Sequence, residues 1–203
     1  IVMRYISATL YLMSQDEDVN YIVQKLSKCK DLESQLNAYL AMIKTDKKIN
    51  LKTLTNMLKA DNYLAYEFVK KAYQNGKINS LPKEYNSQRK IAELCLWNYF
   101  GNTSSGVPDS VIYLKEKTIT YKGEKVKMYV FKCRFEYNGD SYSLAISGPQ
   151  PVDSKKINFD DVLTKSDWRT WTHNTSEERI DEIISDSIKE SEGKGTNPYS
   201  RYD

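Results

Sequence analysis

The chain has 203 residues, of which 40% are hydrophobic and 28% are charged, and these proportions exclude a globally disordered polypeptide. Lysine and arginine number 30 against 27 acidic residues, so the net charge of +3 is too small to indicate nucleic acid or an anionic membrane as the main partner. No apolar run approaches the roughly 20 residues that a membrane-spanning helix needs.

The first residue is Ile1 rather than methionine, and it opens an apolar pattern typical of a helix. We therefore expect the chain to be the C-terminal part of a longer protein, in which case the absence of a targeting segment is uninformative. In chain order, apolar residues at helical spacing predict helices around 6–13, 19–26, 32–43, 51–58, 64–73 and 91–100.

An alanine occurs at the same position of the apolar pattern in four of these helices. The alanines are separated by 30, 27 and 27 residues, at Ala8, Ala38, Ala65 and Ala92. Shifting the helix at 19–26 by 32 residues also superposes its apolar positions on those of the helix at 51–58. Because an alanine at a crossing point allows two helices to approach within about 8–10 Å, the pattern predicts a repeated helical hairpin.

The stretch "DVNYIVQKLSKCKDLESQLNAYLAMI" resembles the short HEAT-like helical repeats of α-solenoids. The resemblance covers roughly residues 1–100 and implies stacked hairpins with a concave binding surface. The usual small residues after the alanine helix and the regular arginine between units are missing. Gly76 and Pro82 also interrupt the third unit, so the stack either ends there or is an ordinary irregular bundle.

A second region begins after the loop-like run "GNTSSGVPDS" at 101–110, where the apolar period changes from helical to two. Strands are predicted at about 111–121, 125–137 and 141–148, with turns at "YKGEK" and "YNGDS". An apolar sheet face needs a cover, which is either the last helix of the repeat region or the C-terminal helix "SEERIDEIISDSIKESE". The predicted class is α+β, with a helical repeat region at 1–100, a linker at 101–110, a sheet with its covering helix at 111–192 and a tail at 193–203.

Catalytic and cofactor motifs are missing from the sequence, which predicts no cofactor, no metal and no catalytic residue. The single histidine is His173, and the three cysteines lack metal-binding spacing. Cys133 and His173 are the one conceivable nucleophile pair, but Cys133 shares a strand face with Phe131 and Phe135, which favours a packed thiol. An odd number of distant cysteines favours a reducing compartment.

The most unusual patch is "SDWRTWTHN" at 166–174, where two tryptophans bracket an arginine in a polar stretch. One interpretation is a partner-binding surface made of Trp168, Arg169, Trp171 and His173. The alternative is that both tryptophans fill the gap between the sheet and the last helix. At the end of the last alanine helix, phase predicts that Trp97 and Phe100 are buried.

Together these features predict a non-catalytic protein-interaction or scaffold module. Its partner would be another protein or an upstream domain of the same chain. The alternative is a substrate-docking or regulatory domain of an enzyme whose catalytic part lies upstream, and a further alternative is nucleic-acid binding, since the first hundred residues carry a net charge of about +5.

Overall fold

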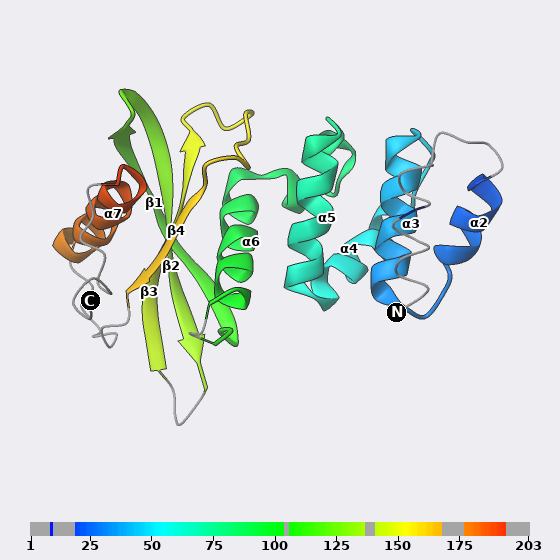
Figure 1. Cartoon of the computed structure of the whole chain (residues 1–203), viewed down its shortest axis with the longest axis horizontal. Coiled ribbons are helices and arrows are strands. Elements are labelled where there is room, and N and C mark those ends of the chain that lie inside the picture. The colour runs from blue at the N-terminus through cyan, green and yellow to red at the C-terminus, as the bar shows by residue number, and fades with distance from the viewer. Residues whose placement is uncertain (1–8, 10–18, 104–105, 137–140, 168–176, 194–203) are drawn as a thin grey trace. The chain divides into compact units, whose positions relative to one another are not determined.

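A computed structural model describes residue 9 and residues 19–103, 106–136, 141–167 and 177–193 (Figure 1). In this part of the chain, helices are followed by a four-stranded antiparallel sheet and a C-terminal helix, which confirms the predicted α+β class. Contacts divide the chain into two compact units, Ile1–Asn86 and Ser87–Asp203.

Unit 1 contains two helical hairpins, as predicted. They are formed by α2 (Val19–Leu26) with α3 (Leu32–Lys44), and by α4 (Leu51–Ala60) with α5 (Asn62–Gln74). The N-caps of α3, α4 and α5 are Asp31, Asn50 and Asp61, whose side chains accept backbone N–H bonds of 2.9–3.1 Å. Beyond α5, the stretch with Gly76 and Pro82 forms two short 3₁₀ helices, η1 (Ile78–Ser80) and η2 (Lys83–Asn86), instead of another α-helix.

The repeated alanines are buried wherever the structure describes them. Ala38 packs with Val23 and Leu26 at the contact of α2 with α3, as an alanine at a helix crossing should. Ala65 is fully buried on α5, whereas Ala8 lies outside the described residues. Ala92 differs from the expectation, because it packs against the sheet of unit 2 rather than against another helix.

Unit 2 contains a sheet with a helix on each face. Its elements are α6 (Gln88–Gly101), β1 (Ser110–Tyr121), β2 (Glu124–Phe135), β3 (Ser141–Pro151), β4 (Leu163–Asp167) and α7 (Glu177–Ser191). The strands follow the order β1-β2-β3-β4, each antiparallel to its neighbour, so the predicted three-strand meander is present and is extended by a fourth strand. Lys122 and Gly123 have positive φ angles, which gives the β1–β2 turn the twist that suits a two-residue hairpin.

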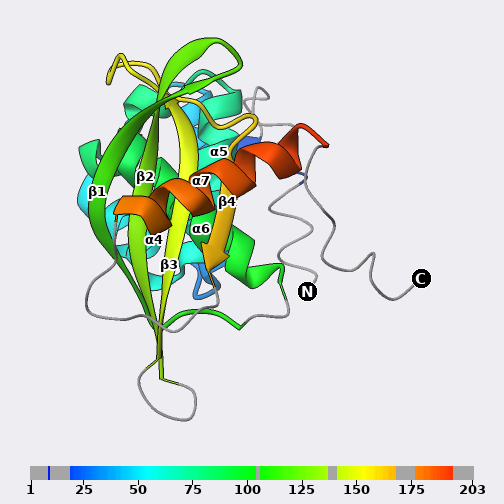
Figure 2. The same ribbon diagram turned by 90° about the vertical axis from the view of Figure 1, so that its left-hand side faces the viewer.

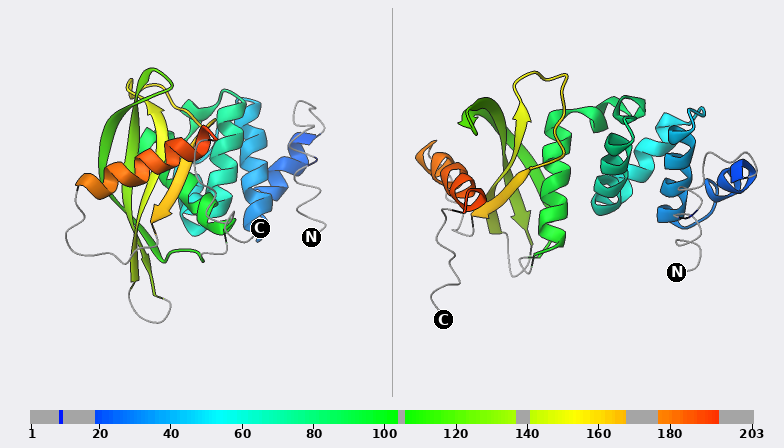
Figure 3. Two further views of the ribbon diagram at one scale, coloured as in Figure 1. Left: turned by 60° about the vertical axis from the view of Figure 1, so that its left-hand side comes forward. Right: turned by 45° about the horizontal axis from the view of Figure 1, so that its top comes forward.

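Each face of the sheet has its own apolar core. On one face, Ala92, Leu96 and Phe100 of α6 pack against side chains that include Phe131 and Ala145. On the other face, three isoleucines of α7 pack against Met128, Val130, Leu144 and Ile146. Figures 1, 2 and 3 show α6 and α7 on opposite sides of the strands. The two alternatives that the sequence offered for the cover are therefore both realised, one on each face.

The division between the units lies before α6, between Asn86 and Ser87, and not in the run 101–110 that the sequence indicated. The physical reason is the packing of α6, whose apolar face fills the core on one side of the sheet. Helix α6 thus continues the apolar pattern of the preceding helices in the sequence, but it packs against the sheet in the structure.

Candidate functional site

The predicted partner site, formed by Trp168, Arg169, Trp171 and His173, lies outside the described residues, in the segment between β4 and α7. The role of these four side chains therefore stays a prediction. At the end of α6, Phe100 is buried as predicted, whereas Trp97 is partly exposed. A candidate site on the described surface has to come from other residues.

The cysteines are free thiols. Cys29 is partly exposed, and Cys95 and Cys133 are buried. Burial raises the pKa of Cys133 to about 12. Because the thiolate is the nucleophilic form, Cys133 is a packed thiol at neutral pH, which is the role that its strand pattern indicates.

Two further kinds of site are not seen in the described ranges. There, no three histidine, cysteine, aspartate or glutamate side chains gather in a way that could hold a metal ion. In the same ranges, the helices are too short or too polar to cross a membrane. The described surface does contain two hollows, one in each unit.

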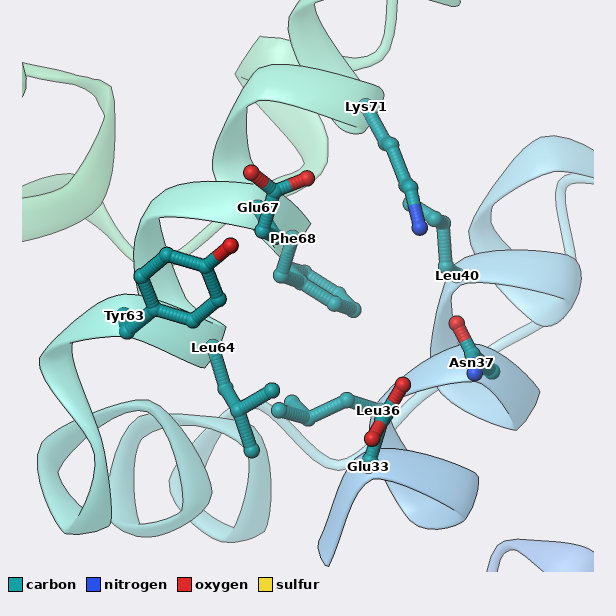
Figure 4. Close-up of a pocket in the computed structure, with 9 residues that line it drawn as sticks. All are labelled: Glu33, Leu36, Asn37, Leu40, Tyr63, Leu64, Glu67, Phe68 and Lys71. Atoms are coloured by element: carbon teal, nitrogen blue, oxygen red, sulfur yellow. The ribbon is translucent and has the colours of Figure 1, made fainter. Parts of the chain in front are cut away.

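The hollow of unit 1 is a groove of about 260 Å³ between α3 and α5, the second helices of the two hairpins. Figure 4 shows apolar side chains at its floor and polar side chains around them. The volume is slightly below that of a typical small-molecule site. The lining residues are Glu33, Leu36, Asn37, Leu40, Tyr63, Leu64, Glu67, Phe68 and Lys71.

The two walls of the groove are built alike. An aspartate caps each helix at its start, Asp31 for α3 and Asp61 for α5. The dipeptide Ala-Tyr occurs in both helices, 27 residues apart, and all four of these side chains are buried. Helices α3 and α5 therefore bury corresponding residues of the repeat. The groove lies between these two helices.

A polar stripe follows the α5 wall. Tyr63, Glu67 and Lys71 are spaced four residues apart, which places them one above another on a single helix face. In the part of the chain that the structure describes, these side chains make no hydrogen bond or ion pair. Tyr63 is 47% exposed, so its ring and hydroxyl are accessible to a ligand. The stripe thus offers a donor, an acceptor and both charges to a ligand.

The α3 wall is more buried and more apolar. Leu36 and Leu40 are only 3% and 2% exposed, and they form the floor together with Phe68. Glu33 lies in the first turn of α3, where a carboxylate is favoured by the helix dipole. In Figure 4, Glu33 lies toward one end of the groove and Lys71 toward the other, with Glu67 on the α5 wall closer to Lys71.

The hollow of unit 2 is wider, about 810 Å³, and lies at the end of the sheet near the β1–β2 turn. Its floor is held by Gln150, which is fully buried and exchanges two hydrogen bonds with the backbone of Asn158. Of the lysines on its rim, Lys122 is already paired with Asp161 at 3.9 Å. We take the groove of unit 1 as the candidate site, because there the side chains of Tyr63, Glu67 and Lys71, which make no hydrogen bond or ion pair within the described part of the chain, face an apolar floor.

The sequence contained a signal for this groove. The spacing of Tyr63, Glu67 and Lys71 is visible in the chain, as is that of Glu33 and Asn37. Such charges usually belong to the solvated face of a helix, and only the contact of α3 with α5 shows that the two sets face each other.

Comparisons with protein-family models, with curated proteins and with solved structures yield no match to this chain. An apolar floor with a rim of one hydroxyl, one amide, two carboxylates and one ammonium can position and recognise a bound segment.

Proposed function

We propose that the protein is a non-catalytic protein-interaction module, and that its helical hairpins form a short HEAT-like stack. In this proposal, the partner is another protein, and it docks with a linear segment in the groove between α3 and α5. The analogy with solenoids supplies only the general idea of a binding surface between stacked helices.

Two features support the stack. The hairpins α2–α3 and α4–α5 follow each other directly, and the alanines of α3 and α5 are buried at equivalent positions. The 3₁₀ helices after α5 then provide an end for the stack, at the place where Gly76 and Pro82 interrupt the pattern.

The observation that carries the proposal is the α5 stripe. Glu67 precedes Lys71 by four residues, the order in which two such side chains usually pair on a helix surface. Here no such ion pair is present, and both line the groove instead. Polar side chains that do not pair with one another beside an apolar floor are available for hydrogen bonds and ion pairs with a partner.

Site-specific photo-cross-linking tests the proposal. A photoreactive phenylalanine derivative would replace Tyr63 in the groove and, in a matched control, Tyr21 of α2, which is 67% exposed but does not line the groove. We expect protein adducts at position 63 and not at position 21, in extracts of the cells that produce the protein. The groove-filling variant Leu64→Trp should remove those adducts while leaving the circular dichroism spectrum unchanged.

Each other outcome has a clear meaning. Equal adducts at both positions, or adducts that persist in the Leu64→Trp variant, would contradict the groove as the docking site. Adducts with nucleic acid would favour the nucleic-acid alternative. Adducts with another segment of the same polypeptide would favour a docking or regulatory domain of an enzyme.

A further inference from the structure

We infer that the groove between α3 and α5 selects a segment with a basic side chain, an apolar side chain and an acidic group in line. The basic side chain lies at the Glu33 end and the acidic group lies at Lys71. This inference rests on the proposed function and adds the chemistry of the partner. Three properties of the groove support it: the charges of its two walls, the orientation of Lys71 and its apolar floor.

The first step is the distribution of charge. One carboxylate comes from each wall, Glu33 from α3 and Glu67 from α5, and the described lining contains one ammonium, that of Lys71. The lining therefore carries one more carboxylate than ammonium, and Figure 4 shows Glu33 at the end of the groove opposite Lys71, with Glu67 on the α5 wall closer to Lys71. A cleft with low-dielectric walls concentrates such a field, so a cation is favoured between the two carboxylates.

The second step is the orientation of Lys71. Its side chain extends along the groove toward Leu40 and away from Glu67 in Figure 4. Since the described residues offer its ammonium no acceptor, an anionic group of the partner can supply one. The Glu33 end then favours a cation and Lys71 favours an anion, which sets the order of the charged side chains along the groove.

The third step is the floor. Leu36, Leu40 and Phe68 are buried and lie between the charged ends, which suits one aliphatic side chain of the partner. The stem of an arginine or lysine also packs well on such a surface. A cavity of about 260 Å³ has room for side chains but not for a folded element, so the occupant is a linear segment.

Fluorescence anisotropy with synthetic peptides tests the inference on the full chain. The probe is a labelled ten-residue peptide with one arginine, one leucine and one glutamate in that order, separated by glycines. A second peptide has the reverse order, since the groove does not fix the chain direction. Two further peptides replace arginine by citrulline or glutamate by glutamine.

We expect one of the two orders to bind, and citrulline or glutamine to weaken binding by about tenfold each. The variant Glu67→Gln should weaken binding of the arginine peptide by a similar factor. It should hardly change binding of the citrulline peptide, because that peptide already lacks the positive charge with which Glu67 interacts. Likewise, Lys71→Met should weaken binding of the glutamate peptide and hardly change binding of the glutamine peptide. The control Glu84→Gln changes an exposed glutamate outside the groove and should have no effect.

The outcomes separate this inference from the proposed function. Equal binding of all peptides that is lost in Leu64→Trp would overturn the charge selection and leave the docking groove standing. The same conclusion would follow if no peptide bound but position 63 still gave specific cross-links. Binding that is insensitive to every groove variant, or the absence of both binding and cross-links, would overturn both.

Discussion

Gln88, the first residue of α6, connects this helix to a loop more than 60 residues further along the chain. Its amide nitrogen lies 2.6–2.9 Å from the carbonyl oxygens of Pro151, Asp153 and Lys156. Its amide oxygen accepts a hydrogen bond of 3.1 Å from the hydroxyl of Tyr129. Because Gln88 is only 4% exposed, one buried amide holds both the loop and a strand residue in place.

We therefore expect Gln88→Ala to destabilise the protein by about 1–3 kcal/mol, since buried hydrogen-bonding groups lose their partner. Urea unfolding measures this loss, and hydrogen exchange should accelerate at Asn158, in the loop that Gln88 holds. Lys156→Ala is the matched control, because it removes an exposed side chain but keeps the carbonyl that Gln88 contacts; its effect should stay within about 0.5 kcal/mol. Equal stability of Gln88→Ala and the wild type would contradict this role.

At the scale of the elements, α7 is held on the sheet by charges as well as by its isoleucines. At its first turn, Glu177 pairs with Lys115 of β1, and Lys117 of the same strand pairs with Asp181. Arg179 and Glu190 are paired with residues of β4, at 2.8 and 2.6 Å. The helix is thus tied to both edge strands of the sheet (Figure 2).

These pairs predict a dependence on pH. The hydrogen bond from Lys115 lowers the pKa of Glu177, so the stabilisation is present above the pKa of an unfolded glutamate, about 4.3, and is lost as the pH falls through the folded value. On the alkaline side, the hydrogen bond with Asp181 raises the pKa of Lys117, and that contribution is lost as the pH rises above about 10.4. Both contributions come from exposed pairs and are small.

Comparison of Glu177→Gln with Glu178→Gln tests this assignment. Both carboxylates lie in the first turn of α7, but an ion pair to the sheet is present only for Glu177 among the described residues. We expect Glu177→Gln to lower the urea midpoint more than Glu178→Gln at pH 6, and the difference to vanish at pH 3 or in high salt. A difference that is the same at both pH values would contradict the ion-pair account.

The elements also show what could be predicted from the sequence. The periods of the apolar residues were sufficient for α2 to α5 and for β1 to β3, because each of these elements is long or regularly patterned. They were insufficient for β4, whose five residues "LTKSD" are mostly polar and become a strand only by pairing with β3. The partner of α6 was equally hidden, since an apolar helix face does not reveal whether it meets a helix or a sheet.

The candidate site was predictable only in its parts. The polar residues of the groove are visible at helical spacing, yet their meeting depends on the contact between α3 and α5. The aromatic patch around Trp168 and Trp171 drew attention through its composition, but it lies outside the described residues and stays a prediction. Composition points to unusual residues, whereas a binding surface is a property of tertiary contacts.

For the whole molecule, the division before α6 predicts which fragment is stable. A fragment of residues 87–203 should unfold cooperatively, because it retains both helices that cover the sheet. A fragment of residues 102–203 lacks α6 and should expose Phe131 and Tyr129, bind a hydrophobic dye and lose its near-ultraviolet circular dichroism signal. If the shorter fragment unfolded as cooperatively as the longer one, α6 would not be part of the second unit.

The central claim is that the groove between α3 and α5 is the docking surface, and nuclear magnetic resonance tests it most directly. The labelled chain would be titrated with whichever of the two arginine–leucine–glutamate peptides binds more tightly. We predict shifts of the amide signals at residues 33–40 and 63–71, with those of the hollow near the β1–β2 turn unchanged. Shifts confined to residues 121–126 and 149–161, or no shift at either place, would contradict the claim.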